Sequence, residues 1–234
     1  MLNRKVSILL KYYPDDYITR GSEGEIYATN EGVYKKFAWN VSIKKRNRKE
    51  QLLLFLTEIE ELKPYYPEIR YLVTSLLNLY IKGYVMKPII GGELDSSAYL
   101  IEERFNALLE LKRILAIFRK HGLLYYDIRR PNIKLDSNHN PILLDIDGLL
   151  FEGEKLDATP YYIKKYIAKG GKLDIHAQTL MFNRFTQLCF QYNELEQEFI
   201  YDKEGKKIMT DSVKFDSAFD HEYLCDHMTL KKQL

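Results

Sequence analysis

The sequence contains few cysteines and no long apolar run. Its 234 residues include two cysteines, Cys189 and Cys225, whose number and spacing exclude a disulfide framework and favour a reducing compartment. The longest apolar stretch, around residues 51–56, is far shorter than the roughly 18 residues that a membrane span needs. Residues 1–10 carry too short an apolar run for a signal peptide. We therefore expect a cytoplasmic protein with no membrane partner.

An excess of charge of one sign is also missing. Lysine and arginine total 35 against 33 aspartates and glutamates, which leaves a net charge of +2 at pH 7. So small an excess argues against a protein whose main partner is a nucleic acid. With 46% hydrophobic and 29% charged residues, the composition is that of a folded globular chain with one mid-sized domain or two small lobes.

The first ninety residues combine short strand patterns with one helix. Residues 17–37 predict three short antiparallel strands separated by glycine-bearing turns. Leucines at helical spacing predict a helix over residues 48–63 that ends before Pro64. Two further strands are expected at residues 70–74 and 83–90. This order indicates an antiparallel sheet with a single helix.

Beyond Gly91 and Gly92 the chain becomes mainly helical. A long amphipathic helix is predicted over residues 97–121, with Gly122 just past its C-terminal end. Its apolar face is formed by Phe105, Leu108, Leu111, Leu115 and Phe118. We expect an α+β protein with one lobe at residues 1–92 and a second at residues 93–234.

An amide and a carboxylate in the second half could share a cation. Short strand patterns flank a turn, and a turn centred between Asn138 and His139 places Asn132 opposite Asp145 in an antiparallel hairpin. Their side chains would then lie about 5 Å apart at Cβ. Hard oxygen ligands of this kind favour Mg²⁺ or Mn²⁺.

A third polar residue suggests proton transfer. Asp127 lies in a loop five residues before Asn132 and next to Arg129, where it could accept a proton from a hydroxyl nucleophile. A solvated aspartate and an asparagine bonded to nearby backbone would explain either residue alone. The combination of Asp127, Asn132 and Asp145 at these spacings is harder to explain in that way.

This combination resembles the catalytic loop and metal-binding segment of the protein kinase-like superfamily, as found in small bacterial-type or eukaryotic-like Ser/Thr kinase domains. The resemblance implies that Asp127 is the catalytic-loop aspartate and that Arg129 replaces the usual lysine. It also implies that Asn132 and Asp145 bind magnesium or manganese. The expected fold is bilobal, with an antiparallel β-sheet N-lobe carrying one helix and a mostly helical, shortened C-lobe.

The resemblance continues upstream in a glycine-rich turn. Residues 19–27 look like the family's phosphate loop, although a Gly-x-x-Gly turn is also common in ordinary hairpins. The resemblance places Gly21, Ser22 and Gly24 near the phosphates of ATP. It adds Ile26 and Val33 to the nucleotide site, with Val33 against the adenine.

Two adjacent lysines follow, and strand alternation separates them. Lys35 shares a face with Val33, while Lys36 points to the other side. The resemblance selects Lys35 to hold the α and β phosphates. It also calls for an acid on the following helix, for which Glu50 fits better than the later glutamates at 58 and 60.

Residues 84–94 are similar to the family's hinge. Met86 takes the gatekeeper position, and Glu93 lies near the ribose. Because Pro88 has no amide proton, a purine should bond the backbone of Lys87 and Ile89.

Several positions depart from the family pattern. Tyr125 and Tyr126 stand in place of His and Arg, which makes activation by loop phosphorylation unexpected. Lys134 replaces an apolar residue under the adenine. With Asp147, the metal-binding motif reads Asp-Ile-Asp in place of the family's Asp-Phe-Gly. In this respect the chain resembles small-molecule kinases, in which a second acid near the metal is common.

The remaining downstream matches are weaker. Residues 159–162 look like the end of an activation segment, and residues 164–166 replace the family's Ala-Pro-Glu. Asp174 resembles the helix aspartate that holds the catalytic-loop backbone. Residues 193–234 suggest one packing helix. The histidines and cysteine there (His221, Cys225 and His227) lack the spacing and fourth ligand of a zinc site.

These features predict an enzyme that transfers the γ-phosphate of Mg-ATP to a hydroxyl. Protein serine or threonine is the favoured acceptor, because the loop reads Asp-Ile-Arg and not the His-Gly-Asp of aminoglycoside-type phosphotransferases. A small-molecule kinase is one alternative, supported by Asp147 and the short C-lobe. A nucleotide-binding pseudokinase is the other, supported by Lys134 and the two tyrosines.

Overall fold

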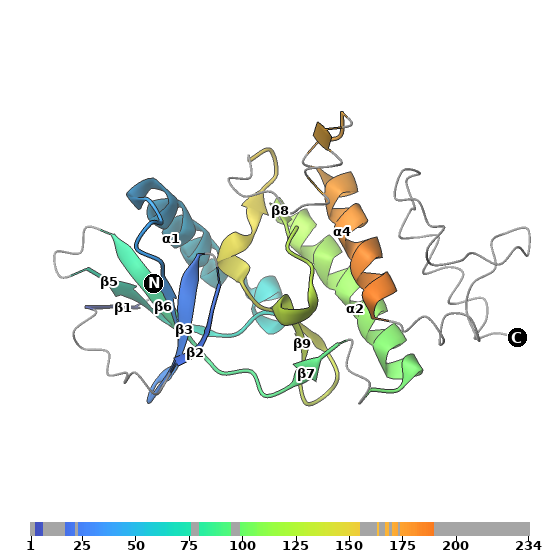
Figure 1. The fold of residues 1–234 in the computed structure, drawn as a ribbon, viewed down its shortest axis with the longest axis horizontal. Coiled ribbons are helices and arrows are strands. Elements are labelled where there is room, and N and C mark those ends of the chain that lie inside the picture. Colours follow the sequence, from blue (N-terminus) through green and yellow to red (C-terminus); the bar gives the residue numbers. More distant parts are fainter. Residues whose placement is uncertain are drawn as a thin grey trace, which may run out of the picture. The chain divides into compact units, whose positions relative to one another are not determined.

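A computed structural model describes residues 3–6, 17–21, 23–75, 80–94, 99–154, 163, 167–168, 170–172 and 174–189. Its architecture is α+β (Figure 1). The chain divides into two compact units. The first unit comprises Met1–Ile90 and Ile142–Gly148, and the second comprises Gly91–Pro141 and Leu149–Leu234.

The boundary between the units differs from the predicted one. The first unit ends at Ile90, two residues before the expected boundary, and it regains the segment Ile142–Gly148. The predicted boundary places that segment in the second lobe. It belongs to the first unit because Asp145 and Asp147 contact lysines of that unit's sheet and helix.

A six-stranded sheet forms the first unit, in the order β1-β5-β6-β4-β3-β2. Neighbouring strands are antiparallel, except that β1 runs parallel to β5. The strands are β1 (Asn3–Val6), β2 (Tyr17–Arg20), β3 (Gly24–Thr29), β4 (Gly32–Phe37), β5 (Ile69–Thr74) and β6 (Ile81–Met86). The predicted three-strand meander of residues 17–37 is therefore confirmed as β2, β3 and β4.

The two faces of the sheet carry different side chains. One face is an apolar cluster of Tyr34, Tyr71, Val73 and Val85. Strand alternation places Lys35 and its cross-strand neighbour Tyr84 on the other face. The helix α1 (Ile43–Glu58) packs against β5 and β6 and buries Leu52, Leu53 and Leu56.

The helix α1 starts and ends earlier than predicted. It begins at Ile43 because the Ser42 hydroxyl accepts a hydrogen bond from the Lys45 amide, at 3.3 Å. It ends at Glu58 and is followed by a short 3₁₀ helix, Glu60–Tyr65, which contains Pro64. The early residues of the helix are polar or basic, so apolar periodicity gives no sign of them.

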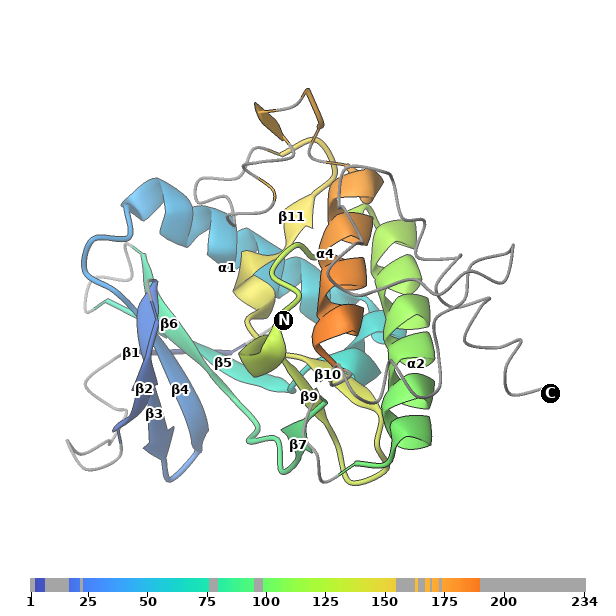
Figure 2. The same ribbon diagram turned by 45° about the vertical axis from the view of Figure 1, so that its right-hand side comes forward.

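Two helices, α2 (Ile101–Lys120) and α4 (Ile175–Leu188), lie side by side in the second unit (Figures 1 and 2). The predicted apolar face of α2 is buried as expected, together with Ala177, Met181, Phe182 and Phe185 of α4. Gly122 ends α2 with a φ of 71° and donates its amide to Arg119 O at 2.8 Å. The Arg104 guanidinium donates to Cys189 O at 2.7 Å, which ties the start of α2 to the end of α4.

Short strands complete the fold. In the second unit β7 (Gly92–Glu93) pairs with β9 (Ile133–Leu135), and β8 (Leu123–Leu124) pairs with β11 (Leu150–Phe151). The strand β10 (Pro141–Leu143) crosses the boundary between the units. Two single 3₁₀ turns, Arg130–Asn132 and Ile146–Gly148, precede β9 and follow β10. Among the described helices, none has both the length and the apolar character that crossing a bilayer requires.

The predicted hairpin register is wrong by one residue. The Asp136 carboxylate accepts the amides of Asn138 and Asn140, at 2.8 and 2.9 Å, and His139 takes a φ of 62°. This turn is centred on Asn138, so a two-residue turn is not formed. Asn132 and Asp145 both lie outside the strands β9 and β10, so the strands end before the predicted cross-strand position.

Candidate functional site

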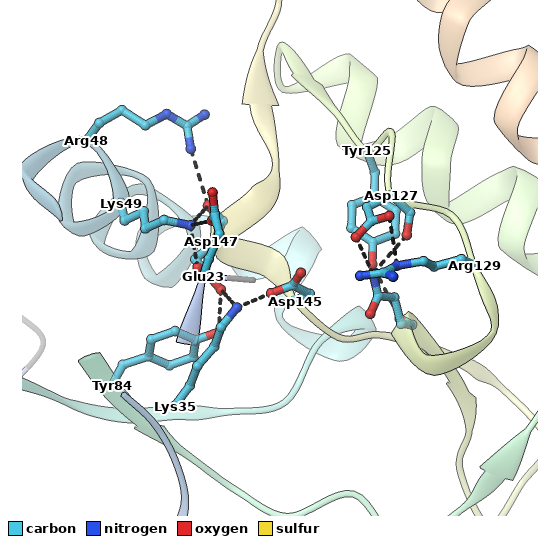
Figure 3. A network of polar contacts seen from close by, with 11 residues as sticks. Glu23, Lys35, Arg48, Lys49, Tyr84, Tyr125, Asp127, Arg129, Asp145 and Asp147 are labelled. Carbon is cyan, nitrogen blue, oxygen red and sulfur yellow. Dashed lines mark hydrogen bonds and ion pairs between the residues drawn. The ribbon is translucent and has the colours of Figure 1, made fainter. Parts of the chain in front are cut away.

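Lys35 and Lys36 have opposite environments, as strand alternation predicts. Lys35 is 8% exposed, and its Nζ contacts Asp145 Oδ1 and Asp147 Oδ1, the latter at 2.5 Å (Figure 3). Lys36 is more exposed and reaches Glu25 Oε2 at 3.3 Å. Lys35 is therefore the lysine that enters a buried charged cluster.

Asp147 is the centre of this cluster (Figure 3). Its Oδ1 accepts hydrogen bonds from Lys35 and from the Tyr84 hydroxyl, the second at 2.8 Å. Its Oδ2 accepts from Lys49 of α1 at 2.6 Å, and its side chain has no exposed surface. Lys49 also forms an ion pair with Glu23 Oε2 at 2.8 Å. We call Glu23, Lys35, Lys49, Tyr84 and Asp147 the buried charge cluster.

Electrostatics keep Asp147 and Lys35 ionised and Tyr84 neutral. Burial opposes the charged form of Asp147, but Lys35 and Lys49 outweigh burial and hold its pKa well below the usual range. Burial likewise disfavours the charged form of Lys35, but Asp147 and Asp145 raise its pKa above the ordinary value. The pKa of Tyr84 is raised by burial and by Asp147, so its hydroxyl stays a donor.

Glu50 is not the partner of Lys35, contrary to the sequence prediction. Its carboxylate forms an ion pair with Arg4 of β1 at 2.6 Å. Lys49 occupies the facing position instead, because it shares a helical stripe with the buried Leu52, Leu53 and Leu56, whereas residue 50 lies about 100° further round the helix. That spacing is a signal in the sequence that could have identified Lys49.

The glycine-rich turn is built partly by packing between strands. Gly21 N donates to Gly24 O at 2.8 Å, which closes the turn between β2 and β3. A Cβ on Gly24 would collide with Lys36 O, so close approach of β3 and β4 already requires this glycine. A Cβ on Gly21 would meet open space. Of the two glycines, Gly21 is the one whose surroundings leave room for a ligand.

The predicted adenine-side residues lie on β3, β4 and β6. Ile26 is opposite Lys35, and Val33 is opposite Met86, so these side chains share the sheet face that carries the buried charge cluster. The Lys87 amide donates to Glu68 O at 2.9 Å, so the purine bond expected at the Lys87 backbone would use its carbonyl oxygen.

Ile89 and Glu93 belong to different units. Ile89 is half-buried in the first unit, and Glu93 lies on β7 of the second unit. Glu93 pairs across the strands with Lys134 of β9, which places opposite charges side by side.

The residues of the predicted catalytic loop come together within the second unit. Asn132 Nδ2 donates to Asp127 Oδ2 at 2.7 Å and to Asp127 O at 3.0 Å. Arg129 Nε forms an ion pair with Asp127 Oδ1 at 2.9 Å (Figure 3). Because its NH₂ group is used by Asp127, Asn132 keeps its Oδ1 as the atom that could bind a cation.

Helix α4 supports this loop, but not through the carboxylate of Asp174. That carboxylate caps α4 by accepting the amides of His176 and Ala177, at 2.9 and 3.4 Å. The loop is held instead by Gln178 Oε1, which accepts the Tyr125 amide at 2.8 Å, and by Asp174 O, which accepts the Tyr126 hydroxyl at 3.3 Å. The side chain of Gln178 and the backbone carbonyl of Asp174 therefore hold the loop, which was the role predicted for the Asp174 carboxylate.

The oxygen donors fit a hard divalent cation of the magnesium type. The described residues contain no group of three or more His, Cys, Asp or Glu side chains that could hold a metal ion. Magnesium commonly needs one or two carboxylates together with phosphate oxygens and water. Asp145, with a φ of 55° and a side chain 33% exposed, is the acid of the first unit that suits this role.

Comparison with known proteins assigns no family. No protein-family model matches the chain, and no curated protein matches it.

Some predicted features lie outside the described residues, namely Ser22 and residues 159–162, 164–166 and 193–234, the last including His221, Cys225 and His227.

Proposed function

We propose that the protein is a kinase-like phosphotransferase with a bilobal fold, which transfers the γ-phosphate of Mg-ATP to a hydroxyl group. The observation that carries the proposal is the contact of Lys35 with Asp145, two residues 110 positions apart in the chain. A lysine buried to this degree needs an anionic partner. Carboxylates provide it in the described structure, and phosphate oxygens would provide it when nucleotide binds.

Each residue has a distinct role in the proposed reaction. Lys35 holds oxygens of the α and β phosphates, and Asp127 orients the acceptor hydroxyl and accepts its proton. Asn132 fixes the Asp127 carboxylate through its Nδ2 group. Asp145 and Asn132 are the proposed ligands of magnesium, which when bound neutralises charge on the phosphates.

Protein serine or threonine remains the favoured acceptor. The small-molecule alternative drew support from Asp147 as a second acid near the metal. Both oxygens of Asp147 are engaged by Lys35 and Lys49, which weakens that support. The pseudokinase alternative drew support from Lys134 in the predicted adenine site. Lys134 lies opposite Glu93 across the strands, and this neighbour of opposite charge weakens that support.

A labelling experiment separates these functions. The purified protein is incubated with Mg²⁺ and γ-³²P ATP, once with a protein lysate and once with a small-metabolite extract, and the Asp127→Asn variant serves as the control. Label in proteins that disappears with the variant supports protein phosphorylation. Label in metabolites supports the small-molecule kinase, and ATP binding without transfer supports the pseudokinase. Absence of both ATP binding and transfer overturns the proposal.

A further inference from the structure

Two aspartates next to Lys35 differ sharply in their surroundings. Asp145 has a side chain 33% exposed, whereas the side chain of Asp147 has no exposed surface. Asp147 uses Oδ1 for Lys35 and Tyr84, and Oδ2 for Lys49. A metal ion at Asp147 would have to displace the buried ammonium groups of Lys35 and Lys49 from its two oxygens, which would leave Lys35 with Asp145 alone and Lys49 with Glu23 alone.

Lys49 explains why the acid at position 147 is needed. It is 4% exposed, and its Nζ also contacts Asp147 O at 3.2 Å and Glu23 at 2.8 Å. Two buried lysines, one from β4 and one from α1, would repel each other without a carboxylate between them. Asp147 places one oxygen on each lysine, so its charge stabilises both of them.

We propose that Asp147 is a positioning residue for Lys35 and not a metal ligand, with Lys49 holding its carboxylate from the helix side. In protein kinases, an acid on the helix faces the lysine on the strand. In this chain the helix supplies a lysine, and the acid comes from the segment Ile142–Gly148. Asp145 is then available for a cation while Lys35 keeps a carboxylate partner. The inference rests on the proposed function for its effect on nucleotide binding.

Four variants test this arrangement. Asp147→Asn should weaken ATP binding by about tenfold, the scale of one lost charge-assisted contact, with the Mg²⁺ concentration for half-maximal binding unchanged. The control Asp145→Asn should raise that Mg²⁺ concentration. Lys49→Met/Asp147→Asn relieves the repulsion and should recover melting temperature without recovering ATP affinity. Lys49→Glu/Asp147→Asn should recover both, because the new glutamate again gives Lys35 a carboxylate.

A second measurement does not depend on nucleotide. An amine-acylating reagent is applied to the ligand-free protein, and fragment-ion mass spectrometry compares labelling of Lys35 with that of Lys36. Labelling of Lys35 relative to Lys36 should rise several-fold in Asp147→Asn and in Lys49→Met/Asp147→Asn, and return to the original ratio in Lys49→Glu/Asp147→Asn. The double variants carry this test if Asp147→Asn does not fold.

The outcomes separate the two proposals. A Mg²⁺ requirement raised equally by Asp147→Asn and Asp145→Asn would overturn the positioning role, as would full recovery of ATP affinity in Lys49→Met/Asp147→Asn. An unchanged labelling ratio in Asp147→Asn and in Lys49→Met/Asp147→Asn would overturn it as well. If the unmodified protein binds no nucleotide, the proposed function fails, while the labelling ratio still decides whether Asp147 positions Lys35.

Discussion

At the scale of single residues, the adjacent lysines of β4 form a built-in comparison. Lys35→Met should lower the turnover rate by about 10²-fold, a barrier increase of roughly 2.7 kcal/mol, because the phosphates lose their buried ammonium. Lys36→Met should change the rate little, since Lys36 pairs with Glu25 near the surface. Steady-state kinetics with varied ATP measure both. A larger loss in Lys36→Met would contradict the assigned role of Lys35.

Stability should separate the same two variants. Removing Lys35 leaves Asp145 and Asp147 short of a buried partner, at a cost of about 3 kcal/mol in the free energy of unfolding. Removing Lys36 breaks an exposed ion pair worth under about 1 kcal/mol. Urea unfolding monitored by circular dichroism gives both values, and it also shows whether a rate loss merely reflects unfolding.

Asp127→Asn should abolish phosphoryl transfer and leave nucleotide affinity nearly unchanged. The Asp127 carboxylate contacts Asn132 and Arg129 within the proposed catalytic loop, and its proposed partner is the acceptor hydroxyl. Asparagine has the same shape but cannot accept the proton. Isothermal titration with Mg-ATP and the radiolabel assay measure the two properties separately. Equal losses of binding and transfer would show that Asp127 acts on the nucleotide.

Sequence reasoning succeeded where one periodicity decided the outcome. Alternation along β4 was enough to predict that Lys35 is buried and that Lys36 is not. The helix partner of Lys35 was predicted wrongly as Glu50, because the resemblance calls for an acid on the helix, whereas Lys49 is the residue on the buried stripe. The structure reverses the charges, with the lysine on α1 and the acid at position 147. The lysine at position 49 and the acid at position 147 are about a hundred residues apart, and periodicity gives no information about contacts between such distant residues.

At the scale of elements, Arg46 fixes the connection between β4 and α1. Its guanidinium donates to Val41 O, Ile81 O and Ala38 O, at 2.9, 3.1 and 2.6 Å. We expect Arg46→Met to lower the free energy of unfolding by about 3 kcal/mol, because three carbonyls lose donors worth about 1 kcal/mol each. The melting temperature should fall by roughly 6 to 12 °C. Differential scanning calorimetry measures this change.

The exposed Lys44 on the same helix provides the matched control. Lys44→Met removes a similar charge without removing a donor from buried carbonyls, and its melting temperature should stay within about 2 °C of the unmodified protein. Similar losses in the two variants would mean that net charge, and not the three hydrogen bonds, accounts for the effect of Arg46.

The predicted elements differ in how far local rules determine them. The long helix α2 was predicted to within a few residues, since its apolar stripe and Gly122 are strong local signals. The start of α1 was missed, because the buried side chains of its first two turns belong to Arg46 and Lys49. The hairpin register was missed because the Asp136 side chain, and not an Asn-Gly type of turn, closes the loop.

At the scale of the whole molecule, the division into units depends on one returning segment. The glycine pair at 91 and 92 was enough to place the first boundary within two residues. The return of Ile142–Gly148 to the first unit follows from the contacts of Asp145 and Asp147 with Lys35 and Lys49. Those contacts could not be predicted, because no local pattern in the sequence pairs Lys49 of α1 with Asp147.

Binding of Mg-ATP should stabilise the whole molecule. A ligand that binds the folded chain at a hundred times its dissociation constant adds about 2.7 kcal/mol to the free energy of unfolding. For a chain of this size the melting temperature should rise by roughly 5 to 11 °C. Calorimetry with millimolar Mg-ATP measures the shift.

Mg²⁺ alone and ATP with excess EDTA should give much smaller shifts, because the cation and the phosphates are expected to bind together. The Lys35→Met variant, if folded, should lose most of the shift, whereas Lys36→Met should keep it. A folded protein whose melting temperature does not respond to Mg-ATP would contradict nucleotide binding and, with it, the proposed phosphotransferase activity.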